Sequence, residues 1–197
     1  MFENPGFNLL AGAFLAGIVG VFTAWITRYF ENAARRQRVA SAIFAEMMQV
    51  IEYLILVVDQ IDRMCRYRDP TMTMIPTEII RMMRPLDRNI LHALGQGVGY
   101  LSTDALNAAV AFDGTMETES RRMREPDFDK PGSRITAQEL RNRICRSLSL
   151  VADNAEVVAD DAYGRQKKMH GEDHLRIDRA RELAKTADPM PGDDKST

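Results

Sequence analysis

The sequence predicts an all-α protein in which an N-terminal transmembrane helix continues into a cytoplasmic antiparallel bundle of three to four helices. Residues 7–26 form a run of twenty residues without a charge. At 1.5 Å per residue this run spans about 30 Å, the thickness of the hydrocarbon layer of a bilayer. Residues 31–68 then contain no glycine or proline, so the membrane helix is expected to continue directly into the rest of the chain.

Charge next to the apolar run predicts its orientation. The first six residues contain Glu3 and no lysine or arginine, which argues against a cleaved signal peptide. Four arginines follow the run, and basic residues of this kind mark the cytoplasmic side of a membrane. We therefore expect the N-terminus outside, the C-terminus in the cytoplasm and the protein in an inner membrane. Arg28, Arg35, Arg36 and Arg38 are expected to face lipid headgroups.

Small residues recur every four positions within the run. Gly12, Ala16, Gly20 and Ala24 fall on one helix face and expose the backbone there. Such faces let two membrane helices approach closely, so a second copy or another membrane protein is the expected partner. The alternative is that glycine and alanine are simply frequent in membrane helices.

The cytoplasmic part of the long helix carries two parallel apolar rows with steps of three and four. Together they are wider than the contact face of a two-stranded coiled coil and favour a multi-helix bundle. One row is Ile43, Met47, Val50, Leu54, Val57, Ile61 and Met64, and the other is Phe44, Met48, Ile51, Ile55 and Val58.

Breaks and caps divide the remaining chain. A second helix is expected from about Pro76 to Gly95, interrupted at Pro85, and a third from the N-cap Ser102 to Arg124. A capping box, Thr136 with Glu139, begins a fourth helix that Gly164 is expected to end or to loosen. The expected organisation is a tail at 1–6, a transmembrane helix at 7–29, a bundle at 30–164 and a charged tail at 165–197.

The charged tail is expected to be a solvated helix or a partly disordered segment, because apolar residues are sparse in it. If the bundle helices alternate in direction, the fourth returns toward the bilayer. The first basic residues of the tail would then also face anionic headgroups; these are Arg165, Lys167 and Lys168.

Composition limits the possible partners. The chain has 26 basic and 28 acidic side chains and a formal charge of −2, and no recognition helix or aromatic platform accompanies the arginines, so nucleic acid is not an expected partner. The two cysteines, Cys65 and Cys145, are expected to be free thiols in a reducing cytoplasm.

No residue pattern predicts catalysis, a cofactor or a metal. Glycines 95, 97 and 99 lack the preceding strand and the lysine of a phosphate-binding loop. His170 and His174 have ligand spacing, but no third ligand is evident and an exposed tail explains them. Glu46 and Glu52 project in different directions and are interpreted as solvated side chains. We predict no catalytic, cofactor-binding or metal residue.

Several short segments, in this order, resemble a group of uncharacterised, membrane-anchored helical proteins from bacterial and prophage genomes. The resemblance covers residues 7–115, and it implies an anchored bundle without implying catalytic residues. The segments that carry it are Phe44-Ala45-Glu46, Pro85-Leu86, Leu94-Gly95 and Gly99-Tyr100-Leu101.

These observations favour a single-pass membrane protein with a non-enzymatic interaction or assembly function. Its expected partners are membrane lipid and either a second copy or another membrane protein. One alternative is an enzyme or ligand sensor whose site lies between bundle helices. Another is a prophage-type modulator of the host envelope.

Overall fold

A computed structural model of the chain describes residues 5–67, 98–124, 136–164 and 169–187. These residues form four α-helices and one 3-10 turn, and no strand occurs among them. The all-α prediction is confirmed for this part of the chain. The helices are α1 (Pro5–Tyr67), α4 (Thr103–Arg124), α5 (Ala137–Tyr163) and α6 (Gly171–Lys185), and the turn is η1 (Val98–Tyr100).

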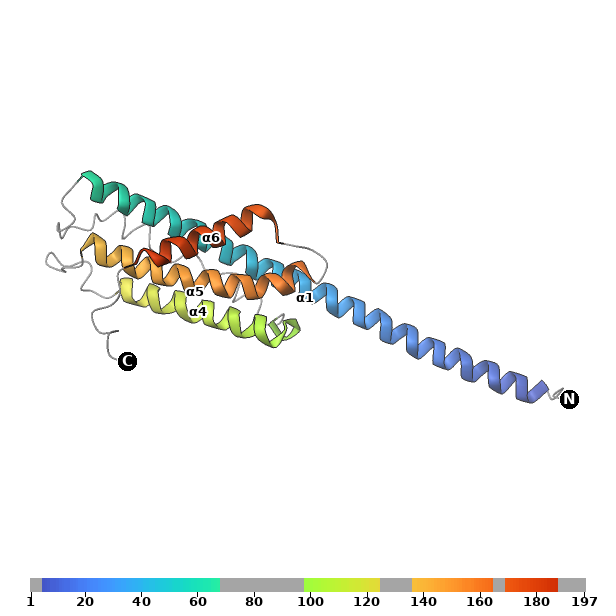
Figure 1. The fold of residues 1–197 in the computed structure, drawn as a ribbon. Coiled ribbons are helices and arrows are strands. Elements are labelled where there is room, and N and C mark those ends of the chain that lie inside the picture. The colour runs from blue at the N-terminus through green and yellow to red at the C-terminus, as the bar shows by residue number, and fades with distance from the viewer. Residues whose placement is uncertain (1–4, 68–97, 125–135, 165–168, 188–197) are drawn as a thin grey trace, which may run out of the picture.

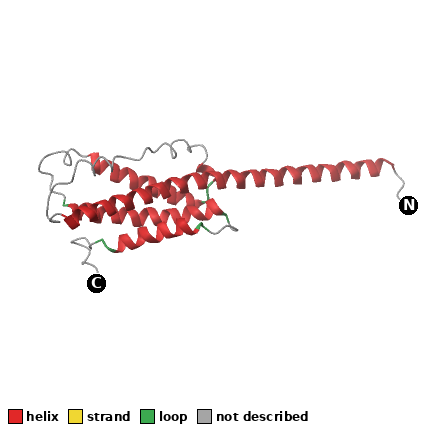
Figure 2. Ribbon diagram, turned by 90° about the horizontal axis from the view of Figure 1, so that it is seen from above, coloured by secondary structure: helices red, strands yellow, loops and turns green. Residues whose placement is uncertain are grey.

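The longest element, α1, is one helix of 63 residues, which corresponds to a length of about 95 Å. Its N-terminal half projects alone, whereas its C-terminal half packs against the other helices (Figure 1). Figure 2 shows the same projecting rod from above. The predicted continuation of the apolar helix into the packed part of the chain is confirmed, and the absence of glycine and proline from residues 21–67 explains it.

Two apolar rows of α1 form one wall of the core, and α5 forms the other. All predicted row residues from Ile43 to Ile61 are buried, and Met64 at the end of the first row is half-buried. The central helix is α5, which contacts α1, α4 and α6. Its buried face alternates large and small side chains, which allows close helix contacts on several sides; it comprises Leu140, Ile144, Leu148, Val151, Ala155, Val158 and Ala162.

Both predicted N-terminal caps are confirmed. The Thr136 hydroxyl accepts a hydrogen bond from the Glu139 backbone N–H at 3.1 Å, and the Thr136 N–H donates to the Glu139 carboxylate at 2.8 Å. The Ser102 hydroxyl accepts from the Ala105 N–H at 3.2 Å at the start of α4. At the other end of α5, Gly164 has φ 66°, a conformation that favours glycine, and its N–H donates to the Asp160 carbonyl.

Ion pairs and polar contacts show the helix directions. Arg36 near the start of the packed part of α1 pairs with Asp161 near the end of α5, whereas Asp62 near the end of α1 pairs with Arg141 near the start of α5. Therefore α5 runs opposite to α1. The start of α4 and the start of α6 both lie at the end of α5, so both run opposite to α5 as well. The helix expected at 76–95 lies outside the described residues.

Residues 165–197 were expected to form a solvated helix or a partly disordered segment. The described residues 169–187 contain a helix, and this helix is packed against the body instead of being fully solvated. Residues 171–185 form α6, in which Ile177 is 1% and Ala180 is 0% exposed. Leu183 is half-buried against the same core. Ion pairs add to these contacts, namely Arg176 with Glu52, Arg179 with Asp59 and Arg181 with Asp153. Sequence periodicity could not predict this packing, because only two side chains of α6 are buried. The acidic partners of its arginines lie on other helices, α1 and α5.

The replacement Ile177→Ala is expected to destabilise the docked α6. It removes a fully buried side chain, and such truncations cost about 2–5 kcal/mol. Chemical denaturation of the full chain in mild detergent, followed by circular dichroism, measures the effect. The matched control is Leu175→Ala, since Leu175 is 70% exposed on the same helix. Equal stability of both variants would contradict the observed packing of α6.

Candidate functional site

One carboxylate joins three helices where α1 meets the packed body. The Asp161 side chain is 8% exposed and accepts a hydrogen bond from the Arg36 guanidinium. It also accepts one from the Ser102 backbone N–H at 2.8 Å. Since Ser102 caps α4, Asp161 connects the end of α5 to α1 and to the start of α4.

The hydrogen bonds control the charge of this junction. Burial alone raises the pKa of Asp161, but the hydrogen bonds from Arg36 and Ser102 outweigh burial and hold its pKa below the ordinary value. The same hydrogen bond raises the pKa of Arg36. Both groups are therefore charged at neutral pH.

Arg35 makes a second contact at the same level. Its guanidinium donates a hydrogen bond to the Tyr100 hydroxyl at 3.1 Å and lies 5.8 Å from the centroid of the Tyr100 ring. This contact holds η1 against α1. Two of the arginines expected to face lipid thus also contact the protein, while Arg28 and Arg38 are exposed.

The other predicted site residues are placed as follows. Gly20 and Ala24 lie on the exposed, projecting part of α1. Gly12 and Ala16 belong to α1 but precede the residues whose side chains are described. Arg165, Lys167 and Lys168 lie outside the described residues.

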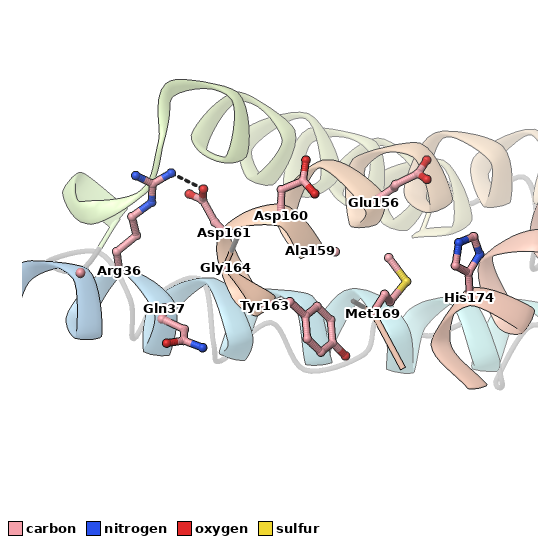
Figure 3. Close-up of a pocket in the computed structure, with 11 residues that line it drawn as sticks. Arg36, Gln37, Glu156, Ala159, Asp160, Asp161, Tyr163, Gly164, Met169 and His174 are labelled. Atoms are coloured by element: carbon pink, nitrogen blue, oxygen red, sulfur yellow. Dashed lines mark hydrogen bonds and ion pairs between the residues drawn. The ribbon is translucent and has the colours of Figure 1, made fainter. Parts of the chain in front are cut away.

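A groove with a volume of about 850 Å³ opens beside the Arg36–Asp161 pair. Its walls come from α1, the C-terminal part of α5 and the start of α6. Figure 3 shows the carboxylates of Asp161, Asp160 and Glu156 in a row along α5, with Arg36 reaching the end of the row from α1. Met169 and His174 line the opposite side.

Tyr163 separates this groove from a second hollow of about 370 Å³, which lies between α1 and the start of α6. The Tyr163 hydroxyl donates to Asp173 at 2.7 Å, and its ring packs edge-on against Phe44 and His170. Burial and the hydrogen bond to Asp173 raise the pKa of Tyr163. Its hydroxyl is therefore a neutral, positioned donor.

The histidines and cysteines that the structure describes do not share a site. His174 Nδ1 lies 3.5 Å from Asp178, and His170 packs against Tyr163, so the two histidines have separate contacts. Within the described residues no three His, Cys, Asp or Glu side chains gather closely enough to hold a metal ion. Cys65 and Cys145 are free thiols, and burial raises the pKa of Cys145.

Glu46 corrects the interpretation of two solvated glutamates. Its Oε2 atom is buried without a hydrogen-bond partner, and burial together with the nearby charge of Asp113 raises its pKa. Glu52 is exposed and lies 3.8 Å from Arg176. Helix periodicity separated the two side chains correctly, but it could not show that Glu46 lies toward a neighbouring helix.

Comparison of the chain with protein-family models, curated proteins and solved structures yields no significant match.

The replacement Asp161→Asn is expected to destabilise the folded chain by about 1–3 kcal/mol at neutral pH, because charge-assisted hydrogen bonds are lost from a buried position. The folded-state pKa of Asp161 is lowered, so its contribution is present above the unfolded pKa and is lost as the pH falls through the lower folded value. The difference from the unmodified chain should therefore shrink as the pH falls below about 4.

Urea denaturation at several pH values measures this difference. The matched control is Asp160→Asn, since the neighbouring Asp160 side chain is exposed and has no hydrogen bond or ion pair within the described structure. A constant difference between Asp161→Asn and the unmodified chain at all pH values would contradict the assignment.

Proposed function

We propose that this chain is a single-pass inner-membrane protein whose residues 7–29 cross the bilayer and whose helices form a cytoplasmic bundle. In this proposal the protein acts as a non-enzymatic interaction or assembly module. The observation that carries the proposal is the apolar surface of the projecting part of α1.

That surface is continuous and unusually exposed. Six large apolar or aromatic side chains within residues 19–30 are 59–73% exposed, and contiguous apolar exposure on this scale is typical of interaction or membrane surfaces. They are Val19, Val21, Phe22, Trp25, Tyr29 and Phe30.

Among the described helices, only α1 is long and apolar enough to cross a membrane. Its most apolar 18-residue stretch, however, is 56% buried. Part of its apolar character thus serves the core. Exposure at residues 19–30 distinguishes the membrane part from the core part, and the uncharged residues 7–18 extend it to membrane length.

The position of the arginines supports the proposed orientation. Arginines occur only after the apolar run, which supports a cytoplasmic body.

Two faces of the projecting helix differ in the size of their side chains. Phe22, Trp25 and Tyr29 stack along one face, with ring centroids 6.1 and 6.0 Å apart. Gly20 and Ala24 lie on the opposite face, where a second copy could approach without displacing an aromatic ring.

Reporter fusions test the topology. Green fluorescent protein fused after Thr197 should fluoresce, and alkaline phosphatase at the same position should be inactive because it requires the periplasm. Phosphatase fused before Met1 is the matched control and should be active when an added export signal permits translocation. An active C-terminal phosphatase would reverse the proposed orientation.

The replacement Gly20→Leu tests assembly. The structure has no atom within 4 Å of the position of an added Cβ at Gly20, so the protomer accommodates the change. Self-association should weaken by about 1 kcal/mol or more if the small face packs against a second copy. Energy transfer between labelled full-length chains in vesicles measures association.

The control is Val21→Leu, which adds volume on a different face of the same helix. Unchanged transfer in both variants would exclude a second copy as the occupant of the small face.

A further inference from the structure

We infer that the groove beside Arg36 binds the headgroup of a phospholipid that carries both a phosphate and a primary ammonium, as phosphatidylethanolamine does. This inference rests on the proposed membrane insertion of α1. The general attraction between basic residues and anionic headgroups needs no defined site. This inference differs because it assigns one lipid to one groove.

The groove lies at the correct depth for such a contact. Ala33, Arg36 and Gln37 line it from α1, and they follow the proposed end of the span at residue 29 by four to eight residues. This separation corresponds to about 6–12 Å along the helix. Since headgroup layers extend about 5–8 Å beyond the hydrocarbon on each side, the membrane-proximal end of the groove meets the headgroups.

Arg36 provides the phosphate contact. One amino group of its guanidinium binds Asp161, and its remaining N–H groups have no partner in the described structure. Its side chain is 43% exposed. The pair with Asp161 thus holds the guanidinium in place and leaves donors available, and guanidinium groups match phosphate oxygens well.

Asp160 provides the ammonium contact. Its carboxylate lines the groove without a hydrogen bond or ion pair to any other described residue, whereas Glu156, one turn earlier on α5, is paired with Arg181. Asp160 also lies in the last turn of α5, which contains no basic residue. The negative end of the helix dipole adds to the attraction for a cation there.

Size favours a lipid over a free headgroup. The volume of about 850 Å³ is within the range of sites that enclose drug-sized molecules, and it greatly exceeds that of phosphoethanolamine alone. The side chain of Ala33 also lines the groove, and because it precedes Arg36 on α1 it lies on the membrane side, where it supplies an apolar contact for the glycerol and the first acyl carbons.

Native mass spectrometry of the full chain, released from mild detergent with equal amounts of competing lipids, tests the inference. The ethanolamine lipid should bind about tenfold more tightly than the choline lipid of the same acyl composition, because the trimethylated nitrogen cannot donate the charge-assisted hydrogen bond to Asp160. Phosphatidylglycerol has the phosphate but no ammonium, so its binding measures the contribution of the Arg36–phosphate contact alone.

The replacement Asp160→Asn isolates the site. It should reduce ethanolamine-lipid binding by about tenfold and leave phosphatidylglycerol binding unreduced. Asp104→Asn is the matched control, since Asp104 is exposed on α4 and lies outside the groove. It should leave the lipid preference unchanged.

Three outcomes would overturn the inference. These are equal binding of ethanolamine and choline lipids, loss of preference in both aspartate variants, and equally tight binding of soluble phosphoethanolamine, which would identify a free ligand. Carbonate extraction of membranes tests insertion separately. A chain that resists extraction but shows no lipid preference would contradict this inference and leave the proposed membrane function intact.

Discussion

The continuity of α1 is the constraint on which the rest of the structure depends. One helix supplies both the exposed apolar rod and one wall of the core, with no glycine or proline between residues 21 and 67 to permit a bend. The other helices take their places from the buried face of this wall. Because α5 covers that face, α4 and α6 pack mainly against α5. The body is therefore attached rigidly to whatever surrounds the rod.

Sequence predicted the elements of this fold that depend on local chemistry. The two rows from Ile43 to Ile61 were recognisable from their spacing, and the caps at Ser102 and Thr136 from hydroxyl side chains before helical patterns. The docking of α6 was not predictable in this way. Its buried contribution is limited to Ile177 and Ala180, and its arginines find acidic partners more than twenty residues away in sequence.

The junction at Asp161 was hidden for a similar reason. Its sequence context, Asp160-Asp161 near the end of an amphipathic helix, is that of two solvent-exposed carboxylates. The packing of α1 and α4 against the end of α5 gives the two aspartates different surroundings. Asp161 is nearly buried and accepts two hydrogen bonds, while Asp160 stays exposed. The groove depends on this inequality, because one carboxylate holds Arg36 and the other remains available.

An unbroken helix also fixes the directions in which side chains at its two ends point about the helix axis. Gly20 and Ala45 are 25 residues apart, as are Ala24 and Gln49, and 25 residues make almost seven turns at about 3.6 residues per turn. Ala45 and Gln49 are exposed, and both lie at the hollow between α1 and the start of α6. The small-residue face of the rod is therefore aligned with this exposed strip of α1 and not with the buried face that α5 covers. The number of residues between rod and body, more than any one side chain, sets this alignment.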